Sequence, residues 1–483
     1  MRYVSTRGQA PVVDFADALL AGLARDGGLY VPESWPCLSA AEIRALAGLP
    51  YAEAAFRVSR PLVGDAIDEA TYRDILEQTY AGFSHAATAP LVQLAPNHWL
   101  LELFHGPTIA FKDYAMQLLG NLFNHVLSQR GRRVTIVGAT SGDTGSAAIE
   151  ACKDRDAIDI FILYPHNRVS EVQRRQMTTV ASKNVHCFAL RGTFDDCQAI
   201  LKALFADGAF RDEVSLTGVN SINWARILGQ IVYYFVAGAA LGAPDRGVSF
   251  AVPTGNFGNV YAGYAARRMG LPVEQLVLAT NANDILSRTL ATGTMKRGEV
   301  VPSLSPSMDI QVASNFERFL FEIVGRDGAR VAQQMAAFAD TGELTLAPGL
   351  WREATAVFTG YRLDDAGTIE EIRESLARTG QVLDPHTAIG VAGGRAALCA
   401  ANIKEGGSAA AARRDAAVPM VSLATAHPAK FPDAVKRATG RVPELPAHMA
   451  DIYSRKERFE VIDNDVAAVK KAVRARLSRK VQA

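Results

Sequence analysis

The chain has 483 residues, of which 49% are hydrophobic and 21% are charged, a composition typical of globular domains. This length predicts two or more domains, because one domain usually takes about 100–200 residues. The 51 Lys and Arg residues nearly balance the 50 Asp and Glu residues. This balance gives no electrostatic reason to expect nucleic acid or an anionic membrane as a partner.

The cysteines and the first residues indicate the compartment. The five cysteines are scattered and form no CxxC pair, which argues against a disulfide scaffold or a zinc site and fits a reducing compartment. The opening sequence MRYVSTRGQAPVVDF has no apolar run behind a basic head, so we expect no secretory signal. No apolar run reaches the roughly 20 residues of a membrane helix. We therefore expect a cytoplasmic protein.

The predicted elements divide the chain into three parts. Residues 1–95 form a mostly helical N-terminal segment, in which Phe15 and Leu19 follow helical spacing. From about residue 132, strands and helices alternate, which predicts parallel sheets covered by helices. We expect a smaller α/β domain over residues 96–225 and a larger one over 226–483. The predicted strands are Val134–Gly138, Ile158–Pro165, Val185–Leu190, Val248–Val252 and Val273–Thr280.

Lys112 is the first candidate for chemistry. It lies in HGPTIAFKDYAMQLLGNLF, in the first turn of a predicted helix and among apolar neighbours such as Ile109 and Phe111. An amine in an apolar pocket has its pKa lowered by desolvation, which suits Schiff-base chemistry. The same local pattern also fits a solvated lysine on a helix surface.

Two glycine-rich loops follow predicted strands. GATSGDTGSA (138–147) and PTGNFGNVYAG (253–263) each lead into a helix, whose first backbone N–H groups can bind an anion. Neither loop is a Walker P-loop, and both could be tight turns with Ser or Thr caps. Two such loops at the carboxyl ends of strands favour a ligand crevice there.

Two further segments are less specific. In NSINWARILGQ (220–230), Asn220 and Asn223 could cap a helix, and Arg226 could pair on its surface. In LATAHPAKFPDAV (423–435), Thr425 and His427 follow a short predicted strand, and a structural role is expected for His427.

Seven segments together resemble the threonine synthase family, in its branch with a long N-terminal segment. In chain order they are DGGLYVPE, HGPTIAFKD, ATSGDTGSA, NSINWARILGQ, PTGNFGN, ATNAND and TAHPAKF. That family belongs to the fold-type II pyridoxal phosphate (PLP) enzymes, of the tryptophan synthase β-like class. The resemblance implies two open, mostly parallel α/β domains and a largely helical N-terminal segment.

The resemblance also implies the roles of individual residues. Lys112 would hold PLP as a Schiff base, Thr425 would contact the pyridine nitrogen, and Asp143 would lie near the cofactor, where many relatives carry Asn. The loop that binds the cofactor phosphate would be Gly255, Asn256, Phe257, Gly258 and Asn259. The substrate ligands would be Thr140, Ser141, Gly142, Thr144, Asn220 and Arg226, and no metal is expected.

The activity implied is the conversion of O-phospho-L-homoserine and water to L-threonine and phosphate. One alternative is a phospho-lyase that forms 2-oxobutyrate from the same substrate. Others are a threonine dehydratase, a β-replacing synthase, or a non-catalytic binding protein with this fold. The expected partner is this small molecule, not nucleic acid or a membrane, and the chain could be a monomer or homodimer. The roles of Asp113, His427 and Lys430 stay open.

Overall fold

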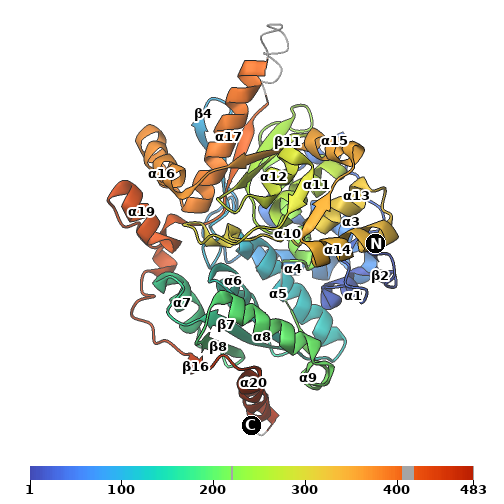
Figure 1. Cartoon of the computed structure of the whole chain (residues 1–483), viewed down its shortest axis with the longest axis vertical. Helices are drawn as coiled ribbons and strands as arrows, with labels where there is room; N and C mark the ends of the chain where they lie inside the picture. The colour runs from blue at the N-terminus through green and yellow to red at the C-terminus, as the bar shows by residue number, and fades with distance from the viewer. Residues whose placement is uncertain (219–220, 405–417, 482–483) are drawn as a thin grey trace. The chain divides into compact units, whose positions relative to one another are not determined.

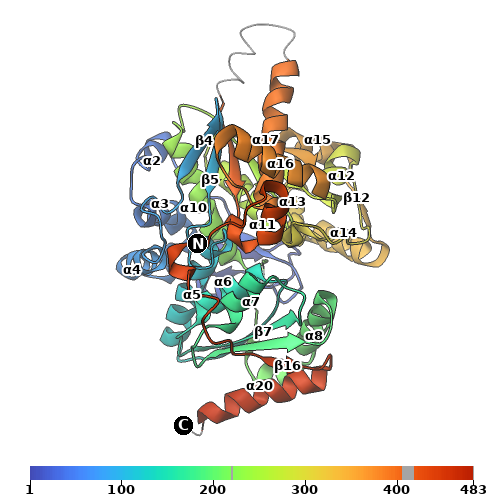
Figure 2. The ribbon, with the colours of Figure 1, turned by 90° about the vertical axis from the view of Figure 1, so that its left-hand side faces the viewer.

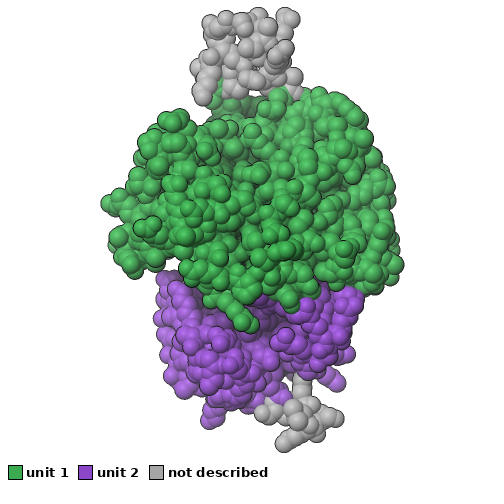
Figure 3. All heavy atoms as spheres, turned by 90° about the vertical axis from the view of Figure 1, so that its right-hand side faces the viewer, with its two compact units in different colours: residues 1–19, 23–115, 221–443 green, residues 20–22, 116–220, 444–483 purple. Residues whose placement is uncertain are grey.

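The structure is a computed structural model that describes residues 1–218, 221–404 and 418–481 (Figure 1). Contacts between Cα atoms divide the chain into two compact units, which Figure 3 shows in two colours. Unit 1 comprises residues 1–19, 23–115 and 221–443, and unit 2 comprises residues 20–22, 116–220 and 444–483. The expected division of the chain at residues 95 and 225 stays a prediction. No helix in the described ranges is both long and apolar enough to cross a membrane.

Within the described residues, unit 1 is built on a six-stranded sheet with the order β14-β11-β10-β15-β5-β4. Strand β4 is antiparallel to β5, and all other neighbours are parallel. The strands are β4 (Leu91–Ala95), β5 (His98–Glu102), β10 (Val248–Pro253), β11 (Val273–Thr280), β14 (Phe358–Arg362) and β15 (Met420–Ala424).

Helices cover this sheet because its central strands are apolar on both faces. Every residue of β10 and β15 is buried, as expected for parallel strands between helices. Helix α17 (Pro385–Lys404), labelled in Figure 1, packs against β10, β11 and β15. Helices α10 (Trp224–Ala240) and α11 (Gly258–Arg268) pack against each other, and α11 also contacts β10 and β11.

The first 80 residues, which belong to unit 1 except for residues 20–22, combine four helices with a small antiparallel sheet of order β2-β1-β3. Helix α3 packs against α4 and α10. The elements are β1 (Arg2–Ser5), β2 (Val13–Asp14), α1 (Phe15–Ala21), β3 (Tyr30–Pro32), α2 (Ala40–Arg44), α3 (Tyr51–Val63), η1 (Gly64–Ala66) and α4 (Glu69–Tyr80).

The remaining elements of unit 1 surround its large sheet. They are α12 (Ile285–Thr292), β12 (Thr294–Lys296), η2 (Pro306–Met308), α13 (Phe316–Ile323), α14 (Gly328–Thr341), β13 (Glu343–Thr345), α15 (Pro348–Val357), α16 (Asp365–Thr379), η3 (Pro428–Lys430) and α19 (Pro432–Thr439).

The described residues of unit 2 form a parallel sheet with the order β16-β8-β7-β6-β9. The chain enters this unit within α5 (Lys112–Gln129). The other elements are β6 (Val134–Ala139), α6 (Asp143–Cys152), β7 (Ile158–Pro165), α7 (Glu171–Thr178), β8 (Val185–Leu190), α8 (Phe194–Ala206), α9 (Gly208–Glu213), β9 (Leu216–Thr217), η4 (Ala447–Met449), β16 (Glu460–Ile462) and α20 (Val466–Val481).

The C-terminal helix completes the core of unit 2. Helix α20 packs against α8 (Figure 2). Its Val469 and Val473 are fully buried in one apolar cluster with Phe161 and Leu204. This segment therefore contributes packing to the sheet on which the 140–144 loop is built.

The predicted fold class is confirmed. The strands expected at Ile158–Pro165, Val185–Leu190 and Val273–Thr280 have these bounds in the structure. Thr193 caps α8 in a capping box with Asp196, as its position before the helix predicts. The large sheet of each unit is wholly or mostly parallel, and helices pack on it.

Candidate cofactor and substrate site

Lys112 is the first residue of α5 and only 7% of its surface is exposed. Its Nζ donates a hydrogen bond to Oγ of Ser307, 3.4 Å away. Ile109 and Tyr114 beside it are buried. The side chain is therefore buried, and the alternative of a solvated surface lysine is wrong.

Thr425 is held next to the segment that precedes Lys112. It follows the last residue of β15, and its carbonyl oxygen accepts a hydrogen bond of 2.8 Å from the amide of Phe111. Ala110 and Ala426 form an antiparallel bridge at the same place. A contact across more than 300 residues of sequence thus places Thr425 beside the lysine.

The loop of residues 255–259 follows β10, the parallel neighbour of β15. Since the carboxyl ends of parallel strands meet at one edge of a sheet, the loop and Thr425 both emerge at that edge. A Cβ atom added to Gly255 would lie 2.7 Å from the backbone oxygen of Ser307. Glycine is therefore required where this loop passes the segment that touches Lys112.

Phe257 gives the loop its conformation. Its φ of 62° lies in the left-handed region, which is unusual for a bulky residue. Its ring lies 5.4 Å from the rings of both Phe316 and Phe358 and is almost completely buried. Aromatic packing thus holds the strained backbone, and α11 begins at Gly258 with no side-chain cap.

Asn259 adds a buried donor to this helix terminus. Its Oδ1 accepts hydrogen bonds from the phenols of Tyr233, at 2.5 Å, and Tyr234, at 3.0 Å. Its Nδ2 is buried and has no hydrogen-bond partner among the described residues. A buried donor and an uncapped helix N-terminus are the groups that a phosphate needs. These residues therefore fit the phosphate of PLP.

Arg226 lies in the first turn of α10 and is 5% exposed. Burial lowers the pKa of its guanidinium to about 10, so that it still carries its charge at neutral pH. The alternative of ion pairing on the helix surface is wrong because this side chain is buried. Asn223 caps α10, as predicted, by accepting a hydrogen bond from the amide of Ala225. Asn220 lies outside the described residues.

The loop of residues 140–144 belongs to unit 2, where it joins β6 to α6. Oγ1 of Thr140 accepts hydrogen bonds of 2.9 Å from the amides of Gly142 and Gly145. Gly142 has a φ of 132°, which a side chain would disfavour. The carboxylate of Asp143 is buried and accepts a hydrogen bond of 2.9 Å from Nε2 of Gln173. The expected turn held by a threonine is therefore present, with Ser141 and Thr144 partly exposed.

Asp113 and Lys430 fix the segment before Lys112. Asp113 is fully buried and accepts hydrogen bonds from the amide and hydroxyl of Thr108, while Nζ of Lys430 donates to the Thr108 carbonyl at 2.9 Å. Burial raises the pKa of Asp113 to about 6, and the hydrogen bonds from Thr108 oppose this rise. His427 caps η3, in agreement with its structural interpretation.

Ser307 and the buried cluster of Asp384, His386 and Thr387 were not predicted from the sequence. Ser307 carries no motif of its own and reaches Lys112 only through the fold. The cluster had a signal in DPHTA (384–388), since Asp before Pro is typical of a helix start.

Known families cover nearly the whole chain. Residues 2–80 match the family described as threonine synthase N terminus, residues 85–359 match that of pyridoxal-phosphate dependent enzymes, and residues 405–473 match threonine synthase, C-terminal.

Individual relatives agree with these matches. A threonine synthase of Pseudomonas aeruginosa is 56% identical over 97% of both chains, and one of Saccharomyces cerevisiae is 38% identical over 99% of this chain and 98% of its own. The crystal structure of PLP-bound threonine synthase from Brucella melitensis aligns with a TM-score of 0.93 and 52% identity over 99% of both chains. The chain therefore belongs to the threonine synthase family of PLP-dependent enzymes.

Proposed function

We propose that this protein converts O-phospho-L-homoserine and water to L-threonine and phosphate, and that Lys112 is the residue to which PLP is attached. The observation that carries the proposal is the combination in unit 1 of a buried lysine, the adjacent Thr425 and an uncapped helix N-terminus with a buried donor. The family supplies the reaction, and these residues supply the groups that it requires.

The residues of unit 1 bind and orient the cofactor. When bound, PLP acts as an electron sink for the substrate carbon atoms. The amides of residues 255–259 and Nδ2 of Asn259 bind its phosphate. The hydroxyl of Thr425 would contact the ring nitrogen, where a neutral group would not enforce a protonated ring as a carboxylate would. The amine of Lys112 moves protons at Cα and Cβ of the substrate.

Other residues hold the substrate. The guanidinium of Arg226 binds the substrate phosphate through two parallel hydrogen bonds, for which its planar geometry is suited. The proposed ligands of the α-carboxylate are Thr140, Ser141, Gly142 and Thr144, and Asp143 would help to hold the cofactor. Asn220 is a further proposed ligand of the phosphate. Phosphate leaves from Cγ, and the proton removed at Cβ is balanced by a proton added at Cγ, which becomes the methyl group. Water adds its hydroxyl at Cβ, and its other proton goes to the released phosphate. A cytoplasmic location and a monomeric or homodimeric state remain predictions.

Product analysis tests this function. Purified protein is incubated with PLP and O-phospho-L-homoserine, beside Lys112→Ala and the exposed control Lys436→Ala. We expect threonine and phosphate from the unsubstituted protein and from Lys436→Ala, and no threonine from Lys112→Ala. Formation of 2-oxobutyrate in place of threonine would support the phospho-lyase. Turnover of threonine or O-acetylserine alone would support another fold-type II activity.

A further inference from the structure

Asp384 lies directly before α17 and its side chain is completely buried. Its Oδ1 accepts a hydrogen bond from the amide of His386 at 3.0 Å, and its Oδ2 accepts one from the amide of Thr387 at 3.2 Å. This is the pattern of an N-cap, which any buried helix start requires. A cap binds only backbone amides, so by itself it does not determine where the side chains of His386 and Thr387 point.

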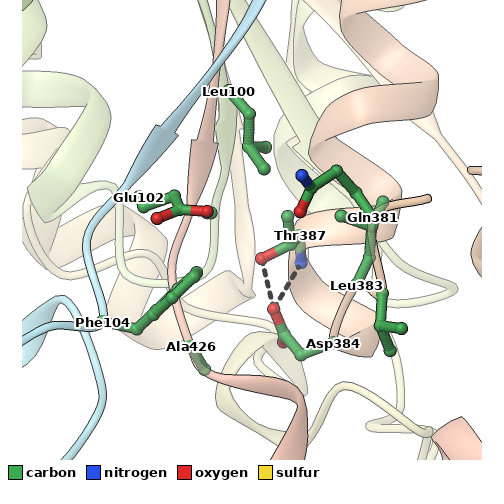
Figure 4. A pocket seen from close by; sticks show the side chains of 10 residues that line it. Leu100, Glu102, Phe104, Gln381, Leu383, Asp384, Thr387 and Ala426 are labelled. Atoms are coloured by element: carbon green, nitrogen blue, oxygen red, sulfur yellow. Dashed lines mark hydrogen bonds between the residues drawn. The ribbon is translucent and has the colours of Figure 1, made fainter. Parts of the chain in front are cut away.

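The side chains of these two residues also donate to Asp384. Nδ1 of His386 lies 2.8 Å from Oδ1. The hydroxyl of Thr387 donates to Oδ2, as Figure 4 shows. The Thr387 hydroxyl has one hydrogen, which Asp384 takes, so that its oxygen can only accept a further hydrogen bond. One buried carboxylate thus orients two acceptors.

The first acceptor holds Ser307. The amide of Ser307 lies 3.2 Å from Nε2 of His386. A backbone amide can only donate, so Nε2 carries no hydrogen and the hydrogen of the imidazole is on Nδ1, facing Asp384. The hydroxyl of the same Ser307 accepts the hydrogen bond from Nζ of Lys112.

The second acceptor holds Thr425. The amide of Thr425 donates to Oγ1 of Thr387 at 3.1 Å, and its carbonyl accepts from the amide of Phe111. Ala424 and Ala426, on either side of Thr425, line a pocket together with Thr387 and Asp384. The hydrogen bonds at its amide and its carbonyl thus fix the Thr425 backbone on both sides.

We infer that Asp384 is a positioning residue for the reaction, which holds Lys112 through His386 and Ser307 and holds Thr425 through Thr387. The inference rests on the proposed function, in which Lys112 carries PLP and Thr425 contacts its ring. Both groups must keep their positions within a fraction of an ångström, because a misplacement of about 1 Å can lower a rate roughly 100-fold.

The substitution Thr387→Val tests this inference, because valine has the same shape and neither donates to Asp384 nor accepts from Thr425. We expect kcat to fall roughly 10- to 100-fold with a smaller change in KM, and the visible absorption maximum of bound PLP to shift. Thr387→Ser keeps the hydroxyl and is expected to restore both. The control is Thr289→Val, which removes another buried hydroxyl, one that donates to the Ile285 carbonyl of its own helix.

The inference is wrong if Thr387→Val keeps the absorption maximum and the kcat of the parent protein. It is also wrong if Thr289→Val lowers the melting temperature as much as Thr387→Val does and changes the absorption maximum and kcat in the same way. Should Thr387→Val not fold, Asp384→Asn provides the test, since it keeps the shape but loses one acceptor oxygen; an unaltered spectrum and kcat would also overturn the inference. If the PLP absorption band persists in the variant Lys112→Ala, the proposed cofactor site itself is wrong.

Discussion

The phenol of Tyr233 donates a hydrogen bond to Oδ1 of Asn259 over 2.5 Å. The two residues lie on the packed helices α10 and α11. The single hydrogen of the Tyr234 phenol is shared between the same Oδ1, at 3.0 Å, and the backbone carbonyl of Asn259, at 2.9 Å. Donors at Oδ1 determine which way the amide points, so that Nδ2 is left for another partner. The uncharged side chains of Tyr233 and Tyr234 thus orient Nδ2 of Asn259 as a donor at the proposed phosphate site.

Asn259→Asp replaces this donor by a carboxylate of the same shape. We expect PLP to bind roughly 10- to 100-fold more weakly, because a hydrogen bond to a charged group is worth about 1.5–3 kcal/mol and the new charge repels phosphate. Titration with PLP, followed by its visible absorption, measures the change. The exposed Asn464→Asp serves as control. Equal PLP affinities of Asn259→Asp and the parent would exclude Asn259 from the phosphate site.

Arg226→Lys tests the proposed substrate contact. Lysine keeps the charge but lacks the planar fork, so we expect KM for O-phospho-L-homoserine to rise roughly 10-fold while PLP affinity stays unchanged. Steady-state kinetics and a PLP titration on the same preparation separate the two effects. A variant with weakened PLP binding and an unchanged KM would move Arg226 from the substrate to the cofactor.

The left-handed backbone of Phe257 predicts an unusual order of stability for its alanine and glycine variants. Both Phe257→Ala and Phe257→Gly lose the buried aromatic packing, at a cost of about 3–5 kcal/mol. Because φ is 62° at this residue, alanine keeps the backbone strain that glycine relieves. We therefore expect Phe257→Gly to be more stable than Phe257→Ala by about 1 kcal/mol, although glycine is usually the less stable of the two. Urea denaturation of the PLP-free proteins measures the difference, and the opposite order would contradict the assigned backbone conformation.

The raised pKa of Asp113 predicts that the stability of the protein depends on pH. Its carboxyl has a pKa of about 6 in the folded protein, raised from the 3.8 of an exposed carboxyl. Between these values the folded state binds more protons than the unfolded state, so the contribution of Asp113 to stability is complete below pH 3.8 and falls as the pH rises to about 6.

The substitution Asp113→Asn isolates this contribution. The free energy of unfolding of the parent minus that of Asp113→Asn should decrease by about 3 kcal/mol over this window and stay level above it. Denaturation series at several pH values measure it, since the difference cancels all other titrating groups. A difference that increases with pH would mean that the hydrogen bonds from Thr108 outweigh burial.

The sequence predicted the elements better than the contacts between them. Strands such as Ile158–Pro165 were predicted because continuous apolar runs are typical of buried parallel strands. Lys112, Thr425 and the 255–259 loop were found through motifs, each in a local segment. Ser307 was not found, because a single serine has no pattern and meets Lys112 across 195 residues of sequence.

The role of Asp384 could not be predicted from the sequence either. DPHTA predicts a capped helix start, and this cap is present. That the two capped residues reach Ser307 and Thr425 depends on how α17 packs on β15. The compact units likewise depend on contacts between distant segments: residues 444–483 group with 116–220.

The attachment of PLP to Lys112 is the central claim, and chemical reduction tests it most directly. The PLP-loaded protein is treated with borohydride, which makes the link between PLP and a lysine permanent, then digested and examined by mass spectrometry. We predict the reduced phosphopyridoxyl group on the peptide that contains Lys112, and no labelled peptide from Lys112→Ala. The same group found on another lysine, Lys430 included, with the Lys112 peptide unlabelled, would contradict the account.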